Sequence, residues 1–175
     1  MEHLSDDQRI TLTFGQLKRL VNEGLEEKFV RQTHDDTHLI DDEFEVNEDG
    51  VLLDYHGNKK NVVIPSGIKG IDGAFKNDDN IVSITIPYGV KFIGMESFQN
   101  CSNLKSVTLP GTLRYIDSYA FENCESLTYI EIPKNTEYVG NGAFSGCDNL
   151  RQATVQLSTK LYDDSFPKHT IQEEF

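Results

Sequence analysis

Two histidines four residues apart, His34 and His38, stand among acidic residues in the stretch THDDTHLIDD. On a helix this spacing would place both imidazoles on one face, where they could ligate a divalent metal ion. A metal site also needs a third ligand and a scaffold that holds the ligands in place, and the pattern predicts neither. The alternative interpretation is a solvated linker, so we expect no metal and no cofactor.

The three cysteines, Cys101, Cys124 and Cys147, follow one another at equal intervals. Zinc sites use paired ligands at Cys-x2-4-Cys spacing, which is absent here. One cysteine at the same position of three successive repeats instead indicates small apolar groups packed in a core. We therefore expect free, buried thiols that react slowly.

The sequence contains no catalytic motif that we can identify. It lacks a nucleophile elbow, a phosphate-binding loop and a metallopeptidase signature. None of the five histidines lies in the central repeats, although a nucleophile and its base are often distant in sequence. We predict that the protein is not an enzyme.

Aromatic and basic residues recur with the same period as the cysteines and form the candidate partner-binding surface. Phe92, Tyr115 and Tyr138 are evenly spaced, and Lys91 and Arg114 directly precede the first two. Aromatic and arginine side chains on a rigid frame are common anchors of interfaces. In the alternative interpretation the aromatic rings only stabilise adjacent coils by stacking on each other. The remaining candidates lie on the predicted strands: Lys105, Tyr129, Glu131 and Arg151.

A repeat that fills the second half of the chain must position these residues. Phe75, Phe98, Phe121 and Phe144 mark its 23-residue period, and columns of Cys, Leu, Ile or Val, and Pro align between them. In the segment 127–133 apolar and polar residues alternate, which predicts a short strand that ends at proline. Stacked copies of such a unit bury a core that one copy alone could not bury.

The units resemble those of the BspA-like leucine-rich repeats, a bacterial family with the rhythm AF-x-x-C-x-x-L-x-x-I-x-I-P, over roughly residues 62–166. The resemblance implies a curved solenoid whose strands stack into a parallel sheet. It also implies exposed columns that bind other macromolecules, often proteins outside the cell. The end units depart from the pattern, with Asp78 in the cysteine column and Gln156 in the proline column. Atypical units are expected at the ends of a solenoid.

Two elements are predicted before the repeat. Residues 13–24 read as a helix with a capping box, an apolar stripe and a terminal glycine. The pair Asp49-Gly50 predicts a hairpin turn between strands 44–47 and 51–55. A second turn leads to 61–64, so that the three strands form a β-meander and cover the edge of the first coil.

The expected fold class is an α/β repeat solenoid of the leucine-rich-repeat type, with short parallel strands, an N-terminal helix and a hairpin or meander cap. We divide the chain into an acidic helical segment and linker, a hairpin cap leading into the first coil, the solenoid, and a capping tail. Their boundaries are 1–42, 43–64, 65–166 and 167–175.

The net charge of −13 is concentrated at the N-terminus, where residues 1–50 carry fourteen acids and five bases. An acidic chain without a basic stripe is not expected to bind nucleic acid directly. As written, the sequence opens with no signal peptide, which predicts a cytoplasmic protein, or a surface or secreted one if the chain is a fragment. No stretch is apolar enough for membrane insertion.

These patterns favour a non-catalytic module that recognises another protein, whose identity the sequence does not indicate. Two alternatives stay open. The acidic N-terminal segment fits a decoy or inhibitor of a basic or nucleic-acid-binding protein, and the aromatic ladder fits a carbohydrate-binding surface. The sequence leaves the oligomeric state undetermined.

Overall fold

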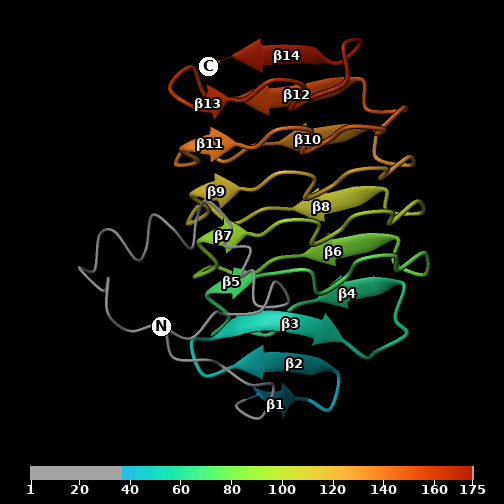
Figure 1. The fold of residues 1–175 in the computed structure, drawn as a ribbon, viewed down its shortest axis with the longest axis vertical. Helices are drawn as coiled ribbons and strands as arrows, with labels where there is room; N and C mark the ends of the chain where they lie inside the picture. Colours follow the sequence, from blue (N-terminus) through green and yellow to red (C-terminus); the bar gives the residue numbers. More distant parts are fainter. Residues whose placement is uncertain (1–36, 175) are drawn as a thin grey trace, which may run out of the picture.

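The structure is a computed structural model that describes residues 37–174. Figure 1 shows coils stacked along the long axis of the molecule, with their short strands in two columns. The strands are β1 (Thr37–Ile40), β2 (Phe44–Asn47), β3 (Val51–Tyr55), β4 (Asn61–Val63), β5 (Gly70–Ile71), β6 (Ser83–Thr85), β7 (Phe92–Ile93), β8 (Ser106–Thr108), β9 (Tyr115–Ile116), β10 (Tyr129–Glu131), β11 (Tyr138–Val139), β12 (Gln152–Val155), β13 (Lys160–Leu161) and β14 (Ile171–Glu174).

The two columns of strands form two walls. One wall is an eight-stranded sheet in the order β1-β2-β3-β5-β7-β9-β11-β13, here called the long wall. The other, the segmented wall, consists of two three-stranded sheets, β4-β6-β8 and β10-β12-β14. From β3 onward the neighbours in the long wall pair in parallel. The predicted solenoid with short parallel strands is therefore confirmed.

The predicted α/β character is wrong for the described residues, because no helix occurs between residues 37 and 174. In each coil the chain returns between the walls through turns rather than through a helix. These turns contain residues with positive φ, such as Glu96 at 58° and Asn100 at 62°. A residue in this left-handed conformation cannot continue a right-handed helix, so no helix forms there. The predicted helix over residues 13–24 lies outside the described residues.

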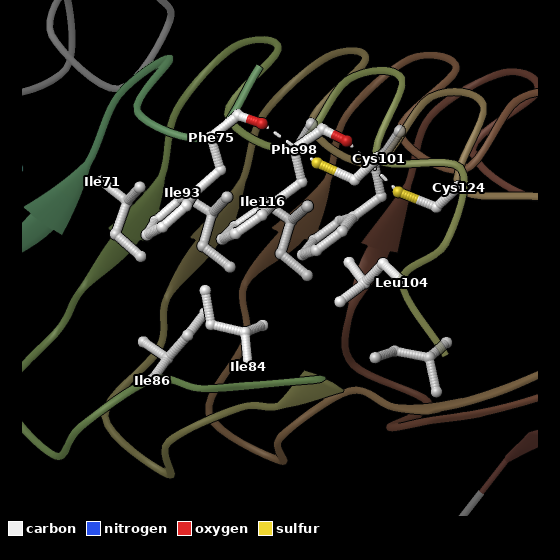
Figure 2. Packing of buried hydrophobic residues seen from close by; sticks show 14 of the residues in the cluster. Ile71, Phe75, Ile84, Ile86, Ile93, Phe98, Cys101, Leu104, Ile116 and Cys124 are labelled. Carbon is white, nitrogen blue, oxygen red and sulfur yellow. Dashed lines mark hydrogen bonds between the residues drawn. The ribbon is translucent and has the colours of Figure 1, made fainter. Parts of the chain in front are cut away.

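The core is built on the predicted phenylalanine column. Phe75, Phe98, Phe121 and Phe144 are at most 1% exposed, and successive rings stack with centroids 4.9–5.1 Å apart and interplanar angles of 3–6°. Phe166 extends the column by a further ring at 4.8 Å. In Figure 2 the isoleucines of the long wall line up beside these rings. One continuous apolar column thus runs through the solenoid.

The hairpin of β2 and β3 is present as predicted, with its turn closed by a hydrogen bond from Gly50 N to Asn47 O at 2.9 Å. The predicted third strand of the meander is wrong. The strand β4 pairs in parallel with β6 on the segmented wall, because Val62 must face the core there. The third strand is β1, which comes from the predicted linker and pairs antiparallel with β2.

At the other end of the molecule, β14 pairs in parallel with β12. This strand belongs to the tail for which a capping role was expected. The Thr170 hydroxyl donates to Leu150 O at 2.8 Å, which attaches the tail to the preceding coil. The edge of β12 is therefore covered by a strand of the same chain.

Candidate functional site

The predicted aromatic ladder lies on the long wall. The Phe92 ring packs over Gly70, where an added Cβ would lie 2.1 Å from the Phe92 Cζ atom. Parallel pairing places Tyr115 beside Phe92 and Tyr138 beside Tyr115, and the two tyrosine rings are 5.1 Å apart. The ladder is therefore a continuous column, as the period predicts.

Exposure decreases along this ladder. Phe92 and Tyr115 are partly exposed, whereas Tyr138 is only 5% exposed because the Tyr162 ring lies edge-on against it at 5.9 Å. The same burial raises the pKa of the Tyr138 phenol, and burial together with the nearby Glu137 carboxylate raises that of Tyr115. Tyr138 therefore serves packing, and the accessible part of the ladder is formed by Phe92 and Tyr115.

Beside the ladder stand three exposed cations, Lys69, Lys91 and Arg114, which we call the basic column. Their backbones are joined directly, because Lys91 N donates to Lys69 O and Arg114 N donates to Lys91 O, both at 2.8 Å. The same chain of bonds continues to Glu137 at 2.7 Å and then to Lys160 at 2.9 Å. The strands thus hold three cations on three successive coils.

Four of the predicted site residues lie on the segmented wall instead. Lys105 and Arg151 line an open hollow together with Ser126, Thr128 and Asn149. Tyr129 is 45% exposed, and its hydroxyl lies 3.1 Å from Thr154 Oγ1. Glu131 is exposed on the same strand as Tyr129. The predicted residues therefore form two separate faces, one on each wall.

Two members of the long-wall site, Lys69 and Glu137, were not predicted from the sequence. The spacing from Lys69 to Lys91 is one residue shorter than the repeat period, so a search at the fixed period passes over Lys69. Glu137 follows Arg114 by one full period and was detectable. Its carboxylate forms a hydrogen bond with the Tyr115 side chain, which closes one end of the basic column.

One group in the described part of the chain has the geometry of metal ligands: Glu45, Asp54 and His56. Glu45 and Asp54 are opposite each other in the hairpin, and His56 Nε2 lies 3.1 Å from Glu45 Oε2. His56 Nδ1 is 3.9 Å from Asp54 Oδ2, and all three side chains are partly or well exposed. A hydrogen bond from the His56 imidazole to the Glu45 carboxylate accounts for the 3.1 Å contact without a metal.

The predicted histidine pair does not contribute to this group. His38 lies on β1 opposite Val46 and is exposed. His34 lies outside the described residues. The metal hypothesis for these two histidines therefore gains no support from the group that the structure brings together.

The cysteines are free and fully buried, as predicted. Burial raises the pKa of the Cys101 thiol to about 12, and a thiol rather than a thiolate is a poor nucleophile. Two acids of the long wall, Asp72 and Asp117, are also partly desolvated, which raises the pKa of Asp72 to about 6. These groups shape the stability of the fold and do not assemble a nucleophilic centre.

The sequence matches the family profile described as "BspA type Leucine rich repeat region" in six copies over residues 54–173. No protein of curated function matches the chain at a significant level. In the described residues no helix is long and apolar enough to cross a membrane.

Solved structures of bacterial repeat proteins share the fold. A leucine-rich-repeat protein from Bacteroides capillosus is similar with a TM-score of 0.60 and 26% identity over 69% of this chain and 99% of the other. The pneumococcal vaccine antigen PcpA is similar with a TM-score of 0.63 and 20% identity over 74% of this chain and 35% of its own. A leucine-rich cell surface protein from Faecalibacterium prausnitzii has a TM-score of 0.60 at 21% identity, over 79% of this chain and 50% of the other. This chain therefore spans only part of two of these proteins.

Proposed function

The chain belongs to the BspA-type leucine-rich-repeat family, and from this premise we propose that it is a non-catalytic module that recognises another protein through the long wall. The observation that carries the proposal is the pairing of the basic column with the exposed part of the aromatic ladder. Lys91 and Phe92 come from one coil, Arg114 and Tyr115 from the next, and parallel pairing holds them in register. Rings and cations on a rigid frame are the usual anchors of protein interfaces.

The interior of the solenoid supports a surface role. The residues that point inward are fully packed phenylalanine, isoleucine, leucine and cysteine side chains, so the variable side chains stand on the outside. Leucine-rich-repeat proteins present such outward columns to other proteins as a general rule. A solved relative is described as a cell surface protein. A location of this chain at the cell surface would expose its long wall to proteins outside the cell.

The two alternatives receive less support. A sugar-binding surface would use stacked, open rings, but Tyr138 is buried under Tyr162. The decoy alternative rests on the acidic N-terminal segment, most of which lies outside the described residues, and the walls themselves carry exposed cations such as Lys91 and Lys105. We therefore favour the long wall as the recognition surface.

Site-specific photocrosslinking tests this proposal. A photoreactive amino acid placed at position 91 on the long wall should form an adduct with a defined protein of the native host. The same amino acid at position 105, which is also exposed and lies on the segmented wall, is the matched control and should form far less of this adduct. Adducts from position 105 alone, or from neither position, would contradict the proposal.

A further inference from the structure

We propose that the basic column formed by Lys69, Lys91 and Arg114 binds an acidic segment of the partner protein, with the carboxylates of the segment placed along the column. This inference rests on the proposed function and adds the chemistry of the partner. Its starting point is a column of like charges that the fold itself does not explain.

The three cations directly precede the adjacent parallel strands β5, β7 and β9, and neighbouring strands are about 4.8 Å apart. The direct backbone bonds from Lys91 to Lys69 and from Arg114 to Lys91 fix this order. Like charges directly opposite each other on neighbouring strands destabilise a sheet. The column is therefore an arrangement that costs stability in the isolated molecule.

Several other cations of the described residues have partners of their own. Lys59 Nζ lies 2.7 Å from Glu43 Oε2, and Lys76 Nζ lies 2.6 Å from Glu96 Oε2. Lys160 folds back over the Tyr162 ring, 4.4 Å from its centroid. Within residues 37–174, no ion pair is formed by a member of the basic column.

Two side chains of the column, Lys69 and Arg114, are also held at the surface. The aliphatic stem of Lys69 lies over Gly50, where an added Cβ would be 3.4 Å from its Cγ and Cδ atoms. The Arg114 Nη1 atom donates to Asn135 O at 3.3 Å, which leaves further guanidinium N–H groups available. A guanidinium can bind a carboxylate through two parallel hydrogen bonds. The column thus presents positioned donors to an anion.

The length of the column selects the kind of anion. Three neighbouring strands span about 10 Å, and Glu137 follows next in the same chain of backbone bonds. A long polyanion such as a nucleic acid would extend past Arg114 onto this carboxylate, and the net charge of −13 would repel it. In an extended peptide, alternate residues are about 6.5–7 Å apart on one face, so two carboxylates fit within the length of the column.

The neighbouring rings fit the rest of such a segment. Phe92 and Tyr115 are partly exposed directly beside Lys91 and Arg114. In an extended segment the residues between two acids point away from the wall. The residues that precede and follow the acidic stretch can pack on these rings. The recognised sequence is thus an acidic segment with apolar residues close to its carboxylates.

The test uses the full chain and a fluorescein-labelled peptide with three aspartates that alternate with valine, measured by fluorescence anisotropy. The matched peptide has asparagine in place of aspartate. The double variant Lys91→Glu with Arg114→Glu should lose affinity for the aspartate peptide by at least about tenfold. The control Lys105→Glu with Arg151→Glu makes the same charge change on the segmented wall and should alter affinity by less than about twofold. Thermal unfolding of both variants checks that each one folds.

Four outcomes would overturn the inference. The first is that the folded wild-type chain fails to bind the aspartate peptide even at low salt, and the second is that the asparagine peptide binds with equal affinity. The third is that the two double variants lose equal affinity for the aspartate peptide. The fourth is that single-stranded DNA or heparin binds more tightly than the peptide, with the same dependence on Lys91 and Arg114. If crosslinking from position 91 to a host protein persists in any of these cases, the proposed function stands and only the acidic chemistry of the partner is wrong. Selective loss in the long-wall variant supports the inference.

Discussion

The Cys124 thiol donates a hydrogen bond to the Phe98 carbonyl oxygen at 3.2 Å, from one coil to the coil before it. The contact recurs from Cys101 to Phe75 at 3.0 Å and from Cys147 to Phe121 at 3.1 Å. Figure 2 shows two of these thiols pointing at the backbone beside the stacked rings. The cysteine column therefore combines close packing with a weak polar link between coils.

This geometry predicts that all three thiols resist labelling in the folded protein. Each one is fully buried, and burial raises the pKa of Cys101 to about 12, which suppresses its thiolate. Labelling with a thiol reagent at neutral pH should follow the rate of unfolding, and denaturant should expose three reactive groups. Fast labelling of any of them under native conditions would contradict the core position of that cysteine.

The substitution Phe121→Ala should lower the free energy of unfolding by about 3–5 kcal/mol. The Phe121 ring stacks on Phe98 at 4.9 Å and on Phe144 at 5.1 Å, so its removal opens a cavity inside the column. Denaturant unfolding followed by circular dichroism measures the loss. Tyr129→Ala, at a 45% exposed ring on the segmented wall, is the control and should cost about 1 kcal/mol or less. Equal costs for the two variants would argue against the ring column.

Thr136 offers a prediction of the opposite sign. It is 2% exposed, it stands in the apolar column of Val90 and Leu113, and its hydroxyl has no hydrogen-bond partner. Replacing it with valine removes a desolvated polar group at nearly constant volume, so Thr136→Val should stabilise the protein by about 1 kcal/mol.

A matched variant controls for the threonine change itself. The Thr159 hydroxyl donates to Thr136 O at 2.9 Å, so Thr159→Val should destabilise the protein by about 1 kcal/mol. Thermal unfolding of both variants is the measurement. Changes of the same sign in the two variants would contradict this assignment.

The carboxyl group of Asp72 predicts a pH dependence of stability. It lies over Gly94, where an added Cβ would be 2.3 Å from its Oδ1 atom. Burial and then the charge of Asp117 raise its pKa from 3.8 to about 6. Because the folded state binds this proton more tightly than the unfolded state, the contribution of Asp72 to stability falls as the pH rises from about 4 to 6.

Asp72→Asn should therefore stabilise the protein by about 1–2 kcal/mol at pH 7, after a discount for the partial exposure of the carboxyl group, and by much less at pH 4. Asp54→Asn, at an exposed acid of the hairpin, provides the comparison. Urea unfolding at several pH values measures the difference. A gain that persists unchanged at pH 4 would show that its origin is not the ionisation of Asp72.

The repeat period was sufficient to predict the fold because a shift by one period maps each core residue onto its neighbour, as from Phe98 to Phe121. It failed where the period changes. Lys69 was missed because the first coil is one residue short. The burial of Tyr138 was missed because Lys160 pairs with Tyr138 at a spacing one residue below the period. This spacing places the Tyr162 ring against the Tyr138 ring. The strand β1 was missed because a short polar edge strand shows no alternation of apolar and polar residues.

The last prediction joins stability to the proposed recognition. If the basic column is kept for a ligand, then breaking it should make the isolated protein more stable. Lys91→Glu places an acid between Lys69 and Arg114, so that the charges alternate on three successive coils. This change should raise the free energy of unfolding by about 0.5–1 kcal/mol at low salt, and the gain should shrink at high salt because exposed charges are screened.

Lys105→Glu is the matched control for this stability change. Lys105 is also exposed, but its backbone partner Val82 and its counterpart on the next coil, Thr128, carry no charge. It should therefore gain little. Urea unfolding of both variants at low and high salt measures the difference. A destabilised Lys91→Glu variant, or a gain that salt does not affect, would mean that repulsion within the column is negligible and that the like charges need no ligand to account for them.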